Sequence, residues 1–287
     1  MTRKITILIT GSNGLFAPHV ISAAEKLGYN VVTTSRHSGM IVSDLTDFQS
    51  TKKLISTVQP NVVINCAALT DVDYCELNPK LADEVNAGIV RNIVRSISPS
   101  TRLLQVSTDQ VYSGENCDNS EDQVGPINVY GKTKLRGEFE AAKCDLALIA
   151  RANFFGDSLV MERQSFSDWI IYKLKREEKI NAFCDVFFSP LRMQTLADSL
   201  LCALHEELFG TYNFGSNIGM SKGEFIIKIA KEIGANLHNI NLIERNAVFS
   251  QAIRPKDLRL DVSAVETSLG IKMPNLSDEI RSLFRDS

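Results

Sequence analysis

The 287-residue sequence lacks several features that mark whole classes of protein. It has no apolar run long enough to cross a membrane and no basic cluster, and its formal net charge is -3. Its six cysteines and four histidines are scattered without metal-ligand spacing, so we expect reduced thiols and no bound metal. No apolar signal segment precedes the first predicted strand. We therefore expect a cytoplasmic protein that binds neither nucleic acid nor a membrane.

The N-terminal region is typical of a buried strand that leads into a phosphate-binding turn. Residues 5–10 form an apolar, β-branched run, as expected for a parallel strand that is covered on both faces. Residues 11–17 follow with the pattern Gly-x-x-Gly-x-x-Ala, in which glycines permit close backbone approach and the next helix presents N-terminal amides to a pyrophosphate. We predict dinucleotide binding here, with a purely structural turn as the alternative. The cofactor contacts predicted in this turn are Gly11, Asn13, Gly14, Leu15 and Phe16.

The end of the second predicted strand indicates which dinucleotide is bound. Residues 30–35 form that strand, and Arg36 follows where proteins that bind NAD commonly carry an acidic residue. An arginine suits a 2′-phosphate, so we expect NADPH, with NADH as the alternative and a solvated surface arginine as the competing interpretation. After the fourth strand, residues 62–65, the small side chains of Ala67 and Ala68 would let a flat cofactor lie against the backbone.

A strand followed by a helix carries the residues that we expect to perform chemistry. Residues 103–106 form an apolar strand that delivers Thr108 near its C-terminal end, where open α/β sheets bind their ligands. Tyr130 and Lys134 stand four apart on a helix predicted to begin near residue 129, so both side chains point the same way. A nearby ammonium would lower the tyrosine pKa towards neutral pH, which makes Tyr130 a candidate acid or base. A surface helix pair is the alternative.

These motifs together resemble the extended short-chain dehydrogenase/reductases, and most closely the dTDP-4-dehydrorhamnose reductase family. The matching motifs are the glycine turn, the Ser-Thr-Asp sequence at residues 107–109 and the Tyr-Gly-Lys-Thr-Lys-Leu-Arg-Gly-Glu sequence at residues 130–138. The resemblance implies that Tyr130 gives a proton to a ketone oxygen and that Thr108 orients the carbonyl group. It implies that Lys134 lowers the tyrosine pKa and holds the nicotinamide ribose.

The resemblance also implies further contacts with the cofactor and the substrate. Asp44 and Leu45 match the adenine-edge position of the family. The implied substrate contacts are Thr70, Asn86, Asp109, Gln110, Phe154 and Arg254. Two of these depart from the family, because Gln110 replaces a tyrosine and Phe154 replaces a tryptophan. The resemblance therefore implies reduction of a ketone more strongly than it implies a particular sugar.

Several of the implied substrate contacts have a structural alternative. Asn86 is equally compatible with a hydrogen bond to a neighbouring carbonyl inside its helix. Asp109 is compatible with a cap on the loop that follows it, and Phe154 with a place in the core. Arg254 and Arg192 are alternatives to one another as the cation that would meet a sugar diphosphate.

After residue 156 the sequence pattern changes. Ser165 and Ser221 each begin a capping box that leads into an amphipathic helix. We therefore predict an α/β fold with a Rossmann-type doubly wound parallel sheet over residues 1–155. A smaller mixed α/β substrate lobe, interleaved with the sheet, is predicted over residues 156–287.

The predicted function is NADPH-dependent reduction of the keto group of a nucleotide-linked deoxy sugar, as in dTDP-rhamnose and polysaccharide biosynthesis. The expected partner is that nucleotide sugar, and a homodimer is compatible with this class of enzyme. A nucleotide-sugar 4-epimerase is one alternative, which Arg36 disfavours because epimerases retain NAD. A dehydratase would need an acidic residue where Gln110 stands. The third alternative is a non-catalytic NADP-binding regulatory subunit that resembles the methionine adenosyltransferase β subunit.

Overall fold

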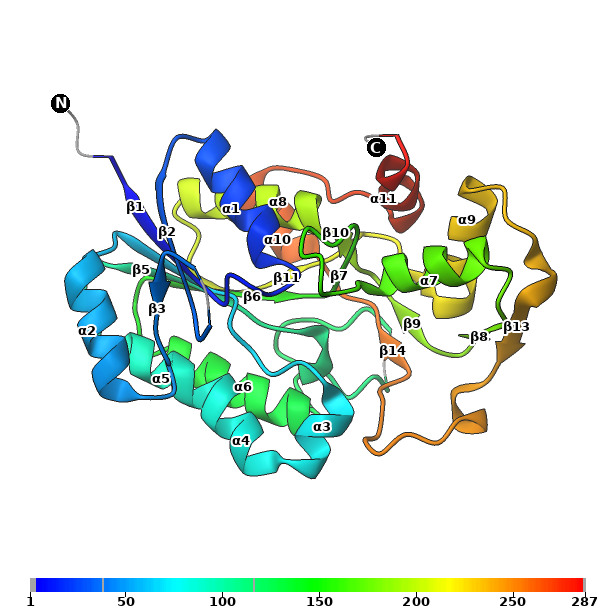
Figure 1. The fold of residues 1–287 in the computed structure, drawn as a ribbon, viewed down its shortest axis with the longest axis horizontal. Helices are drawn as coiled ribbons and strands as arrows, with labels where there is room; N and C mark the ends of the chain where they lie inside the picture. Colours follow the sequence, from blue (N-terminus) through cyan, green and yellow to red (C-terminus); the bar gives the residue numbers. More distant parts are fainter. Residues whose placement is uncertain (1–3, 38, 116, 286–287) are drawn as a thin grey trace.

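A seven-stranded parallel sheet forms the centre of the computed structural model, which describes residues 4–37, 39–115 and 117–285 (Figure 1). Across the sheet the strands are β11 (Gly210–Phe214), β6 (Ala147–Ala152), β5 (Arg102–Val106), β4 (Val62–Asn65), β1 (Thr6–Thr10), β2 (Asn30–Ser35) and β3 (Ile41–Val42). Chain order reverses between β1 and β4, which is the switch point of the dinucleotide-binding α/β fold. The predicted Rossmann-type fold is confirmed, and β2 and β4 have the predicted bounds.

Helices cover both faces of this sheet. On one face lie α1 (Ala17–Lys26), α8 (Met193–His205) and α10 (Ser263–Leu269) (Figure 1). On the other lie α2 (Phe48–Val58), α5 (Ile89–Val94) and α6 (Val129–Ala141). Three short elements precede α5, namely α3 (Val72–Leu77), α4 (Pro79–Asp83) and the π-helical turn η1 (Glu84–Gly88).

The alternation of side chains along each strand supplies both layers of the core. In β1, Ile7 and Ile9 pack towards α1 and α8, whereas Leu8 packs towards α2 and α5. On β5, Leu104 packs on the same side as Ile7 and Ile9, and Leu103 packs on the same side as Leu8. All five side chains are buried, as the apolar character of a parallel strand requires.

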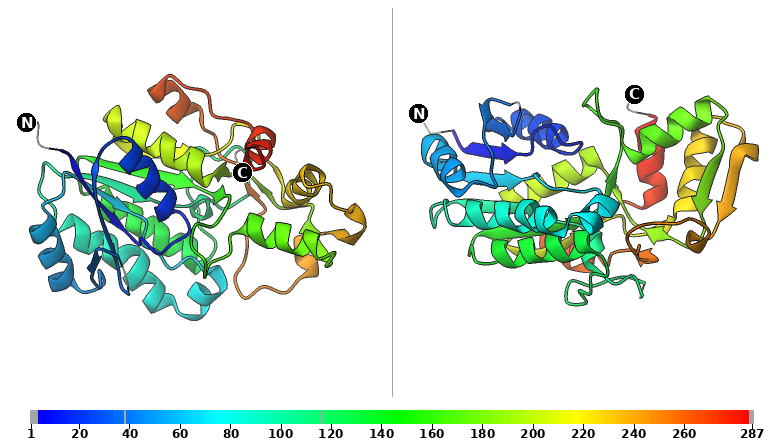
Figure 2. Two further views of the ribbon diagram at one scale, coloured as in Figure 1. Left: turned by 45° about the horizontal axis from the view of Figure 1, so that its top comes forward. Right: turned by 60° about the horizontal axis from the view of Figure 1, so that its bottom comes forward.

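A smaller lobe lies at one end of the molecule, away from the edge formed by β2 and β3 (Figure 2). Its helices are α7 (Phe166–Lys175), α9 (Lys222–Glu232) and α11 (Leu276–Leu283). Its strand pairs are β8 (Ile180–Phe183) with β13 (Ile240–Ile243), and β9 (Phe187–Phe188) with β12 (Met220–Ser221) and β14 (Asp257–Leu258). A further pair, β7 (Phe154–Phe155) with β10 (Leu191–Arg192), connects the lobe to the sheet region.

The two predicted capping boxes begin helices of this lobe. Ser165 accepts a hydrogen bond from the Asp168 amide over 3.0 Å at the start of α7, and Ser221 accepts one from the Glu224 amide over 3.1 Å before α9. Both reciprocal bonds to the acidic side chain are also present. The lobe has its own apolar core, in which Phe225 contacts several other rings.

The C-terminal half of the chain also contributes to the main sheet. Strand β11 pairs with β6, and α8 packs on α1. The division at residues 155 and 156 therefore stays a prediction.

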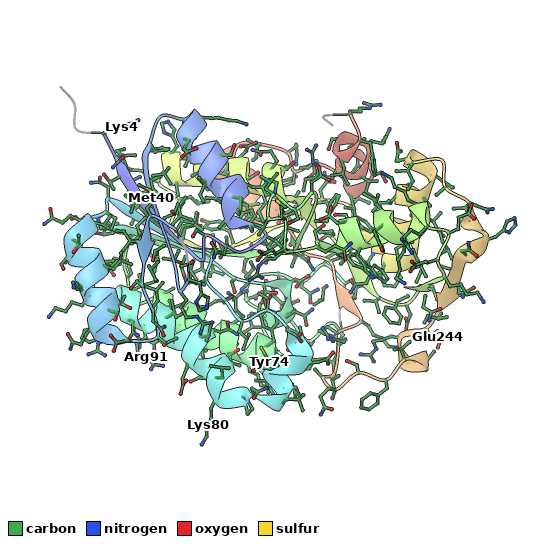
Figure 3. The ribbon with its side chains drawn as sticks, viewed as in Figure 1. Lys4, Met40, Tyr74, Lys80, Arg91 and Glu244 are labelled. Carbon is green, nitrogen blue, oxygen red and sulfur yellow. The ribbon has the colours of Figure 1, made fainter. Side chains whose placement is uncertain are left out.

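The side chain of Lys80 on α4 points away from the molecule (Figure 3). No helix in the part of the chain that the structure describes is long and apolar enough to span a membrane.

Candidate active site

A cavity of about 660 Å³ runs along the carboxyl ends of the central strands. Open α/β sheets bind ligands at this edge, next to the switch point between β1 and β4. The predicted site residues that line the cavity are Gly11, Asn13, Gly14, Leu15, Phe16, Arg36, Asp44, Leu45, Ala67, Ala68, Thr70, Thr108, Asp109, Gln110, Tyr130, Lys134, Phe154 and Arg254. The structure thus brings almost the whole predicted site around one cavity.

The glycine turn lies close to the end of the neighbouring strand. Gly11 has a φ of +67°, and a Cβ atom there would stand 2.7 Å from the backbone of Ala67. The Gly14 amide donates to the Gly11 carbonyl over 2.8 Å, which closes the turn just before α1. A side chain at position 11 would therefore force the turn and β4 apart.

Two other glycines determine how α6 packs against the site. A Cβ atom on Gly131 would clash with the carbonyl oxygen of Gln110, and one on Gly137 would clash with the carbonyl oxygen of Asn86. Asn128 caps the helix, because its side chain accepts a hydrogen bond from the Gly131 amide over 2.9 Å. Gly131 thus allows α6 to approach the turn after β5 closely, and Gly137 allows it to approach η1, which together set the position of Tyr130.

Tyr130 lies buried beside Thr108 at the centre of the cavity wall. Both side chains line the cavity. Burial raises the pKa of Tyr130 above its usual range, while the polar side chain of Thr108 opposes that shift and the charge of Asp109 reinforces it. The phenol is therefore protonated at neutral pH, as a proton donor must be.

Lys134 is buried one helical turn after Tyr130 on α6. Its ammonium donates a hydrogen bond to the carbonyl oxygen of Val106 over 2.7 Å. Burial lowers the pKa of Lys134 to about 8, against the opposing charge of Glu138. In this structure burial dominates the pKa of Tyr130 and the ammonium is directed to Val106, so the lowering of the tyrosine pKa by Lys134 stays a prediction.

A chain of buried polar side chains leads to the same carbonyl group. Gln105 donates to the Val106 oxygen over 2.9 Å and accepts from Asn65 over 2.7 Å. The hydroxyl of Thr10 donates a hydrogen bond to the side-chain oxygen of Asn65 over 2.5 Å. Sequence analysis missed this chain, although polar residues inside three otherwise apolar strands are a signal that could have revealed it.

A second buried network lies behind the catalytic candidates. Glu138 and Arg151 form an ion pair of 2.7 Å, and both side chains are almost fully buried. Ser107 also donates to Glu138, and Arg151 donates to the Tyr112 hydroxyl over 2.9 Å. Because removal of one partner would leave a buried charge unpaired, this network holds β5, α6 and β6 in a fixed arrangement.

Asp109 follows Thr108 and is also buried. Its carboxylate accepts hydrogen bonds from Asn153 over 2.6 Å and from Thr108 over 3.2 Å. Burial raises the pKa of Asp109 to about 6, while these hydrogen bonds and the charge of Lys222 oppose the shift. Asp109 is consequently ionised at neutral pH and faces the cavity.

Asn86 is the predicted substrate contact that the structure places outside the cavity lining formed by the described residues. Its side-chain oxygen accepts from the Leu69 amide over 2.8 Å. Its nitrogen donates to the Leu69 carbonyl over 3.1 Å and to the Thr133 hydroxyl over 3.0 Å. The amide therefore joins η1 to the loop after β4 and to α6, and among the described residues Asn86 is not part of the cavity lining.

The far end of the cavity contains residues that sequence analysis did not single out, namely Asn153, Arg163, Phe166, Phe188 and Lys222. Arg254 lines this end and forms an ion pair of 2.8 Å with Asp73. The alternative cation, Arg192, is absent from the lining that the described residues form, and its amide donates to Glu279 over 2.6 Å. The lobe thus supplies aromatic and cationic side chains to the end of the cavity opposite the glycine turn.

The sheet, the glycine turn and the Thr108, Tyr130 and Lys134 constellation define an extended short-chain dehydrogenase/reductase. The chain belongs to the family of the RmlD substrate binding domain, whose profile matches residues 5–287. The resemblance inferred from the sequence motifs is therefore confirmed.

Individual relatives extend over nearly the whole chain. The Haloferax volcanii protein named "Probable low-salt glycan biosynthesis reductase Agl14" is 31% identical over 291 residues, which cover 96% of each chain. The methionine adenosyltransferase 2 subunit beta of Rattus norvegicus is 26% identical over 92% of this chain and 82% of its own. The crystal structure of dTDP-4-dehydrorhamnose reductase from Bacillus anthracis in complex with NADP has a TM-score of 0.92, with 24% identity over 99% of this chain and 100% of that chain.

Proposed function

We propose that this protein uses NADPH to reduce the keto group of a nucleotide-linked deoxy sugar. The observation that carries the proposal is the position of Thr108 and Tyr130, whose side chains lie near each other on the cavity wall between the glycine turn and the lobe. The names of two relatives, a glycan biosynthesis reductase and dTDP-4-dehydrorhamnose reductase, support a sugar as the substrate.

The residues at one end of the cavity fit a dinucleotide. Gly11 and Gly14 carry no side chains that would block a pyrophosphate, and the turn leads directly into the N-terminus of α1. Arg36 lines the cavity at the end of β2, where it would meet a 2′-phosphate, and Asp44 and Leu45 line the adenine side. NADPH, when bound, supplies the hydride.

The protein's own residues would then stabilise and protonate the substrate oxygen as negative charge develops on it. The Thr108 hydroxyl turns from Asp109 to donate its proton to the carbonyl oxygen, and it holds that oxygen against Tyr130. The Tyr130 phenol, protonated because of its burial, transfers its proton to that oxygen as the carbonyl carbon receives the hydride. The Lys134 ammonium, one helical turn away, stabilises the tyrosinate that remains. The product is an alcohol.

NADPH oxidation with a panel of nucleotide-linked 4-keto-hexoses tests this proposal. We expect the wild-type protein to oxidise NADPH with at least one sugar, and Tyr130→Phe to reduce kcat by about a hundredfold or more, because the proton donor is lost. Tyr29→Phe, at a tyrosine outside the cavity lining, is the matched control and should retain kcat. Equal turnover by Tyr130→Phe and wild type would contradict the proposed mechanism.

A regulatory role is the second candidate, because the methionine adenosyltransferase 2 subunit beta is similar over 92% of this chain. A protein in that role would bind NADPH without oxidising it in the presence of any keto sugar. Tight NADPH binding measured by calorimetry, together with no turnover across the panel, would favour this second candidate.

A further inference from the structure

Lys222 is a lysine of the substrate end of the cavity that the proposed mechanism does not use. It is the first residue of α9, and the Ser221 capping box fixes the backbone that carries it. The ammonium lies 5.7 Å from the centre of the Phe166 ring and 5.9 Å from that of Phe188. These two rings support the side chain from the lobe and direct its charged end to the cavity.

The ammonium of Lys222 has no hydrogen bond or ion pair with any residue that the structure describes. The nearest charges are Asp109, which attracts it, and Arg254, which repels it. Burial lowers the pKa of Lys222, since a buried ammonium without a partner has lost its hydration. A polar group of a ligand in the cavity would restore that lost interaction.

Asp109 faces the same space and can still accept hydrogen bonds. Its carboxylate accepts from Thr108 and Asn153, and an ionised carboxylate has about four acceptor positions. Asp109 and Lys222 therefore form a pair of opposite charges that attract each other across the cavity without direct contact. Arg254, by contrast, is already paired with Asp73.

We propose that Lys222 is a specificity-determining residue that, together with Asp109, recognises the hydroxyl groups of the sugar ring. Asp109 accepts a hydrogen bond from one hydroxyl, and Lys222 donates one to the oxygen of another. The inference rests on the proposed function, because it assumes that the ketone lies at Thr108 and Tyr130, directly beside Asp109.

The charge balance favours hydroxyl groups over the diphosphate as the group that Lys222 meets. Asp109 is ionised above a pH of about 6 and would repel a phosphate placed between the two side chains. A neutral polyol suits the pair, since each hydroxyl group both donates and accepts.

The test compares wild type with Lys222→Met, which keeps an apolar stem against Phe166 and Phe188 and removes the ammonium. The substrates are the keto sugar that wild type reduces and analogues of it that each lack one ring hydroxyl. We expect kcat/KM of Lys222→Met to fall about tenfold to a hundredfold with the parent sugar, which is the usual effect of one lost charge-assisted hydrogen bond. With one of the deoxy analogues, wild type and variant should have nearly equal kcat/KM.

Two controls accompany this comparison. Lys231→Met, at an exposed lysine of the same helix, should leave kcat/KM unchanged with every sugar. Lys222→Arg keeps the positive charge and should recover part of the lost kcat/KM with the parent sugar. The affinity for NADPH, measured by fluorescence titration, should be the same in all variants. An unchanged affinity would show that the cofactor-binding half of each variant is folded.

Three outcomes would overturn the inference in distinguishable ways. An unchanged kcat/KM in Lys222→Met would show that the ammonium does not contact the substrate. An equal loss with the parent sugar and all deoxy analogues would assign Lys222 to the nucleotide diphosphate, which these substrates share. Failure of the wild type to reduce any keto sugar would contradict the proposed function itself, and the inference about Lys222 would fall with it.

Discussion

The ammonium of Lys134 donates a hydrogen bond to the carbonyl oxygen of Val106 over 2.7 Å. This bond joins α6 to the end of β5 just before Thr108, the residue that meets Tyr130. The same oxygen accepts from Gln105 over 2.9 Å. One carbonyl group therefore receives two buried donors, one from the strand and one from the helix.

Replacement of Gln105 by leucine should weaken this junction. The variant would leave the side-chain nitrogen of Asn65 without its acceptor and would remove one of the two donors to Val106. We expect the free energy of unfolding to fall by about 1–3 kcal/mol, because buried polar groups would lose their partners. Urea unfolding followed by circular dichroism measures this change.

Gln123 provides the matched control for that variant. It lies exposed in the loop between β5 and α6, so Gln123→Leu should change the free energy of unfolding by less than about 0.5 kcal/mol. If both variants had the same stability, the buried chain through Asn65 and Gln105 would not contribute to the stability of the fold.

The sequence predicted the sheet because its strands have local signals. The apolar run before Gly11 and the run before Asn65 each mark a strand that is covered on both faces, and the glycine turn between β1 and α1 has a sequence pattern of its own. The capping boxes at Ser165 and Ser221 are equally local, and both begin helices in the structure. Features of this kind depend on residues within a few positions of each other.

The features that sequence analysis missed depend on residues far apart in the chain. Asn86 bonds to Leu69 and Thr133, and no pattern around position 86 reveals those partners. The position of Tyr130 and Lys134 on one helical face was predictable, but the burial that controls their pKa values arises from the packing of α6 against several other elements. Lys222 enters the cavity from a helix that begins more than ninety positions after Tyr130, so only the folded chain brings it near Asp109.

Gly131→Ala should damage the site directly. The new methyl group would clash with the carbonyl oxygen of Gln110, and α6 would have to move away from the turn after β5. We expect a loss of about 1–3 kcal/mol in the free energy of unfolding and a lower kcat, because Tyr130 would move with the helix. Gly88→Ala is the control, since a methyl group there has no neighbour closer than 3.8 Å. Equal stability of the two variants would contradict the close packing described for α6.

Arg36→Ala should change the preference between the two nicotinamide cofactors. Loss of the cation that we propose to face the 2′-phosphate is expected to weaken NADPH binding by about tenfold to a hundredfold, while NADH binding stays nearly unchanged. Fluorescence titration with each cofactor measures both affinities. Arg281→Ala, which removes an exposed arginine on α11, should alter neither. A parallel loss of NADPH and NADH affinity would show that Arg36 does not distinguish the two cofactors through the 2′-phosphate.

Asp109 should give the stability of the protein a specific dependence on pH. Because burial raises the folded-state pKa of Asp109 to about 6, the unfolded chain releases this proton first as the pH rises, and the folded state holds more protons between about pH 4 and 6. The contribution of this group is therefore present at low pH and is lost as the pH rises through that window. We expect the free energy of unfolding of wild type, relative to Asp109→Asn, to fall by about 2–3 kcal/mol between pH 3.5 and 7. Urea unfolding at a series of pH values measures the difference, and parallel curves for the two proteins would contradict a raised pKa at Asp109.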